Sequence, residues 1–248
     1  MKTPLLEVKN LTKEFGKLIA TNNVSFHIES GEIKAVIGPN GAGKTTLFNL
    51  ITGALPPTEG DVFFRNEKIS GLAPNAIASK GMARSFQLLN LFPNLTVFEN
   101  VRLAVQVNHD NKKSLFASAD HLSGIQEKTE ALLERVGISQ YAYQSASKIS
   151  YGDQRALEIS LALATEPTLL MLDEPTSGMS PLESEDIAKL IKEISKDLSI
   201  LLIEHHIDMV MALADSILVM HYGQKLADGT PQDVAADKQV QEAYLGGF

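Results

Sequence analysis

The residue types and spacing that point most directly to chemistry are those of Gly38-Pro39-Asn40-Gly41-Ala42-Gly43-Lys44-Thr45. This segment matches the pattern Gly-x-x-x-x-Gly-Lys-Thr, in which glycines let backbone N–H groups turn towards phosphate oxygens. We expect Lys44 to reach β- and γ-phosphate oxygens, the Thr45 hydroxyl to ligate Mg²⁺, and Thr46 to contact an α-phosphate. The segment therefore predicts a nucleoside triphosphate site, and a tight glycine turn with a solvated lysine is the alternative.

Two consecutive carboxylates provide the second chemical signal. Asp173 and Glu174 follow the apolar run Leu169–Leu172, which is typical of a buried strand. Asp173 suits Mg²⁺ and Glu174 suits the activation of a water molecule. An acidic N-cap for a helix beyond Pro175 is the alternative, which the phosphate-binding segment makes weaker.

Two other classes of phosphate-loop protein are disfavoured by missing residues. A guanine site needs Asn-Lys-x-Asp, but the chain's Asn-Lys pair continues as Asn111-Lys112-Lys113-Ser114, without the aspartate. A small-molecule kinase usually closes a basic lid over its phosphates, and the arginines here are few. ATP is therefore favoured over GTP, and a metabolite kinase stays open as a weaker reading.

Composition limits the class of protein further. The 248 residues include no cysteine, which excludes disulfide scaffolds, cysteine nucleophiles and thiolate metal sites. Acidic residues outnumber basic ones by 30 to 22, giving a net charge of −8 that argues against a nucleic-acid partner. The chain has no apolar run of about 18 residues, and Met1–Asn10 lacks a signal-peptide layout, so we expect a cytosolic protein.

The elements that must position these residues follow from hydrophobic patterning. A buried strand before the glycine loop and a helix after it would place the loop at a helix N-terminus, which favours anions. A later strand, amphipathic helix and strand predict a β-α-β unit with parallel strands. We therefore expect an α/β fold: a phosphate-loop ATPase core with a mostly parallel sheet, an N-terminal antiparallel β region and an inserted helical subdomain. The expected strands are Leu5–Asn10, Val24–Ile28, Ile33–Ile37, Thr168–Leu172 and Ser199–Ile203, and the expected helices are Thr46–Thr52, Leu95–Val105, Gln126–Val136 and Glu183–Lys196.

A third motif carries a family resemblance. Ile149-Ser150-Tyr151-Gly152-Asp153-Gln154-Arg155 lies upstream of Asp173, where nucleotide-binding subunits of ATP-binding cassette transporters carry Leu-Ser-Gly-Gly-Gln. The serine and the second glycine are retained, whereas Tyr151 and Asp153 are departures. Leu122-Ser123-Gly124-Ile125 looks similar but lies too far upstream, and we interpret it as a helix break. The glycine loop, this motif and the paired carboxylates occur in the same order as in the family. The resemblance covers the chain from Leu5 to about Leu245.

The resemblance implies roles for further residues. Gln87 looks like the glutamine that senses Mg²⁺ and faces the membrane partner, although alone it would be an ordinary surface residue. Phe15 stands where the family stacks an aromatic ring on adenine, with a core role as the alternative. His205, rather than its neighbour His206, resembles the switch histidine that contacts the γ-phosphate. Ser180 departs from the aspartate that usually ends a loop connecting two subunits.

The resemblance also implies an assembly. One ATPase domain spans 1–248, with a core at 1–87 and 166–248 and a helical subdomain at 88–165. Ser150 and Gly152, which have no evident use in their own subunit, would complete the ATP site of a second, identical or related chain. The partners would be that chain, integral membrane permease subunits and, indirectly, a solute-binding protein, at the cytoplasmic face of the cell membrane. The apolar segment Leu88–Asn100 would dock to the permease, unless it is subdomain core.

The cargo is a weaker inference than the ATPase. Four runs look most like ATPases of branched-chain amino-acid importers: Tyr151–Arg155, Met171–Pro181, Ile203–His205 and Ala243–Gly246. Urea-type and lipopolysaccharide-export ATPases share parts of them. An ATPase of DNA repair or translation is the remaining alternative. Repair members insert a very long coiled coil between the two halves of the cassette, and Lys44 and Ser150 are too close in sequence to hold one. Translation members usually hold two cassettes in one chain, whereas this chain has one.

Overall fold

The computed structural model describes residues 3–85, 91–109 and 119–245. Gln87 and residues 88–90 lie outside this range, as do residues 110–118 between the first two helices of the insert. Among the described residues, no helix is long and apolar enough to cross a bilayer.

A six-stranded sheet forms the centre of the protein, in the order β10-β9-β3-β8-β7-β6. Neighbouring strands are parallel except for β9 and β10, which form an antiparallel hairpin. Alternate residues of a strand enter opposite cores: Leu170 and Leu172 face one core cluster, and Leu169 and Met171 the other. The strands are β3 (Ile33–Ile37), β6 (Met82–Arg84), β7 (Leu169–Asp173), β8 (Ser199–Ile203), β9 (Ser216–His221) and β10 (Gln224–Gly229).

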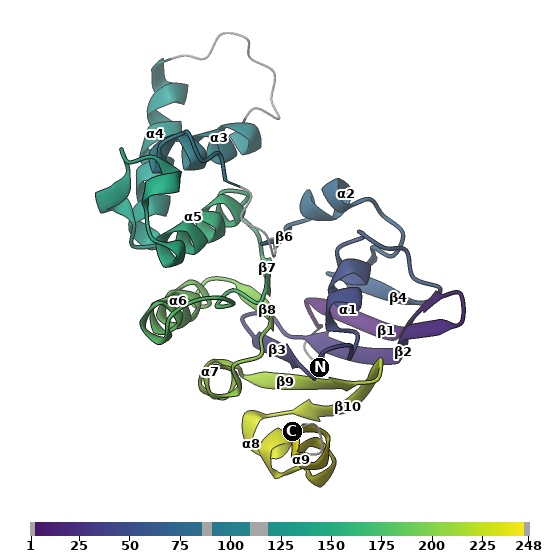
Figure 1. Cartoon of the computed structure of the whole chain (residues 1–248). Coiled ribbons are helices and arrows are strands. Elements are labelled where there is room, and N and C mark those ends of the chain that lie inside the picture. The colour runs from purple at the N-terminus through teal and green to yellow at the C-terminus, as the bar shows by residue number, and fades with distance from the viewer. Residues whose placement is uncertain (1–2, 86–90, 110–118, 246–248) are drawn as a thin grey trace.

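Helices cover both faces of this sheet (Figure 1). On one side lie α6 and α7, and on the other lies α1, which is followed by a second sheet. The C-terminal helices α8 and α9 pack beside β10. The bounds are α1 (Lys44–Ile51), α2 (Pro74–Ala78), α6 (Pro181–Ile194), α7 (Ile207–Leu213), α8 (Pro231–Ala236) and α9 (Lys238–Leu245).

The second sheet is antiparallel, with the order β2-β1-β4-β5. Its strands are β1 (Leu6–Phe15), β2 (Leu18–Ile28), β4 (Glu59–Phe64) and β5 (Glu67–Lys68). The predicted antiparallel region is confirmed, but β1 and β2 are longer than expected because the polar residues Lys13, which is half-buried, and Glu14, which is exposed, continue the ladder. The hairpin β4–β5 was not predicted.

The helices between β6 and β7 form the upper part of the molecule in Figure 1. They are α3 (Val97–His109), α4 (Ala119–Arg135) and α5 (Tyr151–Leu163), with single 3₁₀ turns at Ser139–Tyr141 and Ala146–Lys148. Val97, Val101 and Val105 recur every four residues and are fully buried, which gives α3 its core face. The interpretation of Leu122–Ile125 as a helix break is wrong: α4 runs through it, because one glycine costs a helix only about 1 kcal/mol.

Candidate functional site

The glycine-rich segment forms the connection between β3 and α1, as predicted. A Cβ at Gly38 would lie 2.2 Å from the Met220 backbone oxygen, and one at Gly43 would lie 2.3 Å from the Ala20 backbone oxygen. Both glycines also have positive φ, 154° and 96°. Only glycine fits these positions, because neighbouring backbone approaches the loop closely.

Lys44 is folded into the loop that precedes it. Its ammonium donates to the carbonyl oxygens of Gly38 at 2.6 Å and Pro39 at 3.1 Å. Burial lowers the pKa of Lys44, and the negative charges of Glu174 and Asp173 partly oppose this. A phosphate oxygen would replace the carbonyl partners with a charged one, which makes stronger hydrogen bonds.

Glu174 and His205 converge on the same loop. They follow β7 and β8, and β3, β8 and β7 are adjacent parallel strands, so their carboxyl ends share one edge of the sheet. His205 Nε2 lies 2.5 Å from Glu174 Oε1. Both side chains line a pocket of about 460 Å³ together with Asn40–Thr46. This pocket brings together the predicted loop, the predicted water-activating carboxylate and His205.

His206 turns away from that pocket. Its Nδ1 lies 3.0 Å from the Thr176 hydroxyl, and it lines a different groove between α6 and α7. His205 lines both this groove and the pocket of the phosphate loop, so it lies nearer to the loop than His206 does.

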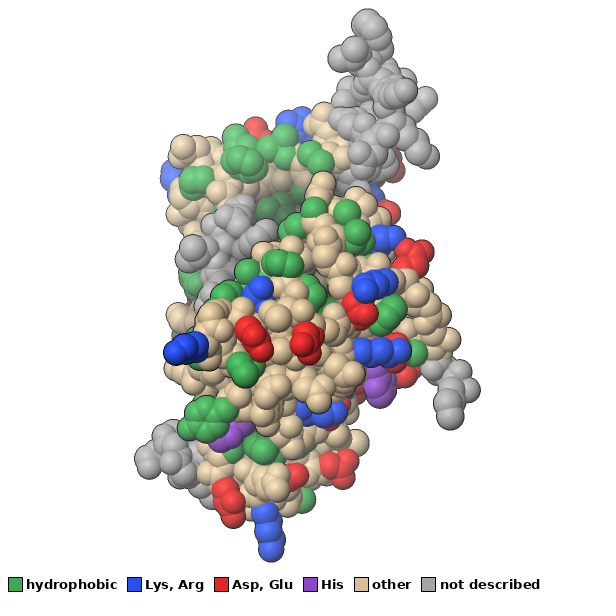
Figure 2. All heavy atoms as spheres, turned by 90° about the vertical axis from the view of Figure 1, so that its right-hand side faces the viewer, with side chains coloured by type: hydrophobic (Ala, Val, Ile, Leu, Met, Phe, Trp, Pro, Cys, Tyr) green, Lys and Arg blue, Asp and Glu red, His purple; other side chains and the backbone are tan. Residues whose placement is uncertain are grey.

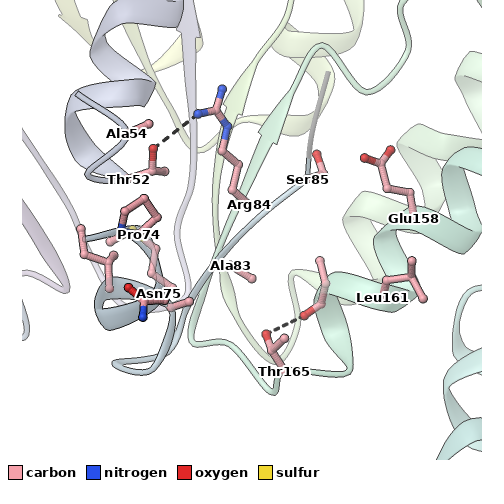
Figure 3. Close-up of a pocket in the computed structure, with 14 residues that line it drawn as sticks. Thr52, Ala54, Pro74, Asn75, Ala83, Arg84, Ser85, Glu158, Leu161 and Thr165 are labelled. Atoms are coloured by element: carbon pink, nitrogen blue, oxygen red, sulfur yellow. Dashed lines mark hydrogen bonds between the residues drawn. The ribbon is translucent and has the colours of Figure 1, made fainter. Parts of the chain in front are cut away.

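Asp173 lies behind the pocket and is 1% exposed. Arg84 Nη2 donates to its Oδ2 at 2.8 Å, and Arg84 Nη1 donates to Asn49 Oδ1 at 2.7 Å, which ties β6 and β7 to α1. Figure 3 shows the Arg84 guanidinium directed towards α1 and Thr52. The other oxygen, Asp173 Oδ1, is buried and has no hydrogen-bond partner.

The oxygen atoms at this edge fit Mg²⁺. The cation prefers hard oxygen ligands and usually takes one or two carboxylates together with phosphate oxygens and water. Asp173 Oδ1 is an unpaired carboxylate oxygen, and the Thr45 hydroxyl lines the pocket. Gln87, the third predicted metal residue, lies outside the described residues.

The open side of the pocket differs from the prediction. Phe15 ends β1, is 46% exposed and does not line the pocket; Lys13 Nζ lies 5.2 Å from its ring centroid. The lining residues there are Leu18–Ala20 of β2 and Tyr222 of the β9–β10 turn. Sequence reasoning missed Tyr222, because only the turn's approach to the loop, through a bond from Gly223 N to Ala42 O, brings it there.

Ser150 and Gly152 lie in a separate pocket of about 460 Å³, away from the phosphate loop of the same chain. The expectation that they have no use in their own subunit is wrong. Ser150 caps α5: its hydroxyl accepts from Asp153 N at 3.1 Å and donates to Asp153 Oδ2 at 2.7 Å. Gly152 N donates to Glu183 Oε1 at 3.3 Å. Asp153, a departure from the family's glutamine, thus has a local role as capping partner.

Ser180, the other departure, also caps a helix. It forms a capping box with Glu183 at the start of α6. Hydrogen bonds from the Ser180 hydroxyl and backbone and from Gly152 N hold the pKa of Glu183 below its usual value. Serine therefore supplies the N-cap that an aspartate would also supply at this position.

A further pocket, of about 470 Å³, lies where β6 and α2 face α5. Figure 3 shows Pro74 and Asn75 on one side and Glu158 and Leu161 on the other, and Figure 2 shows hydrophobic side chains around a hollow in the upper half of the molecule. In the segment expected to dock, Leu91 packs on the core, as the alternative expected, whereas Phe92 is 58% exposed.

Comparisons with known proteins agree with this geometry. A family model described as "ABC transporter" matches residues 21–177, and one described as "Branched-chain amino acid ATP-binding cassette transporter" matches residues 224–248. The chain is 42% identical, over 99% of both lengths, to the high-affinity branched-chain amino acid transport ATP-binding protein LivG of Escherichia coli.

Solved structures confirm the predicted fold class. The ADP conformation of MJ1267, an ATP-binding cassette of an ABC transporter, superposes with a TM-score of 0.86 at 32% identity, covering 99% of this chain and 100% of that one. A dimeric post-hydrolysis state of the cassette MJ0796, bound to ADP and Pi, has a TM-score of 0.76 at 25% identity, over 91% and 98% of the two chains.

Replacing Arg84 should expose the cost of the buried Asp173 charge. Because breaking a buried ion pair leaves an uncompensated charge, Arg84→Met should lower the free energy of unfolding by about 2–4 kcal/mol. The exposed pair of Lys196 with Glu193 offers a matched control, and Lys196→Met should cost at most about 0.5 kcal/mol. Urea denaturation followed by circular dichroism measures the free energy of unfolding of both variants. Equal losses in the two variants would contradict the interpretation that the Arg84–Asp173 ion pair stabilises the fold.

Proposed function

The chain belongs to the ATP-binding cassette transporter family, and from this we propose which residues, partners and solute its ATPase activity involves. It is the ATP-hydrolysing subunit of a transporter and converts ATP and water to ADP and phosphate. The comparisons lend no support to a lipid exporter or to a non-transport ATPase.

The observation that carries the assignment of roles is the pocket in which the phosphate loop, Glu174 and His205 meet. Backbone N–H groups of the loop and the N-terminus of α1 bind the phosphates, and Lys44 places its positive charge at the β- and γ-phosphate oxygens. Thr46, at the same helix N-terminus, contacts the α-phosphate. These residues position ATP without covalent chemistry, as phosphoryl transfer requires.

Glu174 and His205 act on the attacking water and the γ-phosphate. Glu174 Oε1 orients the water and accepts its proton, while His205 Nε2, 2.5 Å away, donates to that carboxylate and orients it. The His205 ring lies beside the phosphate loop and contacts the γ-phosphate in this proposal. Asp173 and Thr45 hold Mg²⁺, together with Gln87, in this proposal. When bound, Mg²⁺ offsets the negative charge on the phosphate oxygens.

The ATP-bound form is a head-to-tail dimer in this proposal. Ser150 and Gly152 lie at the N-terminus of α5, away from their own phosphate pocket, so they can contact the nucleotide of a second chain. The dimeric arrangement of the related cassette MJ0796 supports this reading. Loss of the γ-phosphate contacts after hydrolysis then lets the two chains separate.

The membrane partner docks on the pocket between α2 and α5. Its walls are mainly apolar, with Ser85 among the lining residues, and Phe92 is separately 58% exposed. An apolar helical segment of a permease fits such a groove. The chain would then be peripheral at the cytoplasmic face of the membrane, with a solute-binding protein as an indirect partner.

The adenine lies against Leu18–Ala20 and Tyr222, with Phe15 at the edge of the site.

The solute is a branched-chain amino acid or a related small molecule. Support comes from the 42% identity to a branched-chain amino acid transport ATP-binding protein and from the match of residues 224–248 to the branched-chain family model. The solute itself would contact other polypeptides, so no residue of this chain recognises it.

Glu174→Gln tests the role of the carboxylate. The variant should bind ATP normally but lose turnover by about 10²-fold or more, because the amide cannot accept the proton. Steady-state phosphate release and ATP binding by calorimetry measure the two properties. Glu193→Gln, an exposed glutamate of α6, is the matched control and should hydrolyse ATP normally.

In cells that depend on this transporter, Glu174→Gln should also abolish uptake of radiolabelled leucine. Normal hydrolysis by the variant would remove Glu174 from the role, whereas lost hydrolysis with unchanged leucine uptake would contradict the proposed solute.

Dimerisation should depend on ATP. In the Glu174→Gln background, ATP and Mg²⁺ should double the mass measured by light scattering, and Gly152→Asp should prevent this by placing a charge at the second nucleotide. Gly124→Asp is the control, since a Cβ there meets no atom within 4 Å. A single-chain mass at saturating ATP would contradict a homodimer and favour a related, non-identical second subunit.

Permease docking should be sensitive to charge in the apolar pocket. Ala78→Glu, at an exposed position of α2, and Phe92→Asp should abolish co-purification with co-expressed permease subunits, because a buried unpaired charge is costly. Hydrolysis by the isolated chain should stay within about threefold of normal. Val107→Asp, at a 74% exposed position of α3, should still co-purify. Retained binding by both test variants would place the contact elsewhere.

A further inference from the structure

Glu204 is a buried carboxylate that none of the proposed steps uses. It follows β8, directly before His205, and is 2% exposed. In the part of the chain that the structure describes, it pairs with no lysine or arginine, and His206 Nδ1 lies 3.9 Å from its Oε2. A buried carboxylate without such a partner is costly unless hydrogen bonds compensate it.

The compensation comes from the two loops that carry the reacting side chains. Glu204 Oε1 accepts from Thr176 N at 3.0 Å and from the Thr176 hydroxyl at 2.6 Å. Glu204 Oε2 accepts from His205 N at 2.9 Å and, more weakly, from His206 N at 3.5 Å. Both oxygens are therefore acceptors, one for each loop, and a side chain that also donates cannot make the same set of bonds.

The loop that Glu204 holds is strained. Glu174 has a φ of +49°, a conformation that side chains other than glycine adopt at a cost of about 1–3 kcal/mol. Its N–H donates to Ile203 O at 2.9 Å, so the strained residue is fixed to the end of β8 on one side. Thr176, two residues later, is fixed to Glu204 on the other side. Such strain persists only where surrounding bonds determine the conformation.

We propose that Glu204 is a positioning residue for ATP hydrolysis: its carboxylate clamps the loop after β7 to the loop after β8 and so sets the contact between Glu174 and His205. The inference rests on the roles proposed above for those two side chains. Without the clamp, the 2.5 Å contact between Glu174 Oε1 and His205 Nε2 is not maintained, and the water is no longer held in line.

The test uses Glu204→Gln in the full chain. Glutamine keeps the size but turns an NH₂ group towards N–H donors at one of the two loops. We expect kcat to fall about tenfold or more while the Kd for ATP, measured by calorimetry, changes less than about threefold. Asp215→Asn is a control at an exposed carboxylate: Asp215 also accepts from a backbone N–H, that of Ile33 at 2.8 Å, but at the opposite edge of the sheet, and kcat should stay within about twofold.

A mutant cycle separates positioning from general support of the fold. In a His205→Ala background, measured in single turnovers, Glu204→Gln should lower the rate by no more than about twofold, since the contact it sets is already absent. If Glu204→Gln lowers the rate as much in the His205→Ala background as in the wild-type background, the inference is overturned. An unchanged kcat in the Glu204→Gln single variant would also overturn it. If Glu204→Gln does not fold, Thr176→Val tests the same clamp, because it removes the hydrogen bond from the Thr176 hydroxyl to Glu204. An unchanged kcat in Thr176→Val would overturn the proposal.

The proposed function fails separately from this inference. Normal hydrolysis by Glu174→Gln and His205→Ala would remove the reacting pair itself. Loss of hydrolysis in those two variants, with normal kcat in Glu204→Gln and Thr176→Val, would overturn the role of Glu204 alone.

Discussion

The shared edge of three parallel strands is the constraint on which the rest of the site depends. Because β3, β8 and β7 are neighbours in the same direction, whatever follows each strand emerges at the same edge. The phosphate loop follows β3, His205 lies two residues after β8, and Glu174 follows β7 directly. No long side chain or mobile loop has to bring these groups together, so the site is preorganised by the sheet.

The same edge gathers negative charge, and the protein compensates each carboxylate in a different way. Asp173 is paired with Arg84, which also fixes α1; Glu204 is held by backbone N–H groups; and Glu174 contacts His205. Lys44 adds a positive charge whose pKa burial lowers. These arrangements keep the carboxylates in place before a nucleotide binds, which reduces reorganisation during the reaction.

The departures from the family's motifs have local explanations. Asp153 and Ser180 both take part in helix capping, at the starts of α5 and α6, and Gly152 and Glu183 connect these two helix ends. A change in the motif can therefore be accommodated where the new side chain still satisfies the N–H groups of a helix N-terminus. Capping therefore explains why Asp153 and Ser180 are compatible with the fold. Contacts to a second chain would be made from the same N-termini of α5 and α6.

Several features followed from the sequence by itself: the glycine loop between a buried strand and a helix, the acids that end an apolar strand, and the β-α-β unit around them. Such features are local, because hydrophobic periodicity and glycine spacing report the conformation of neighbouring residues. The tertiary structure alone decided which distant residues meet. Arg84 reaches Asp173 because β6 pairs with β7 in a register that places Arg84 beside Met171. Tyr222, rather than Phe15, lines the pocket because the β9–β10 turn packs on the phosphate loop. Strand register and loop packing depend on the whole core, and no short segment of the sequence encodes them.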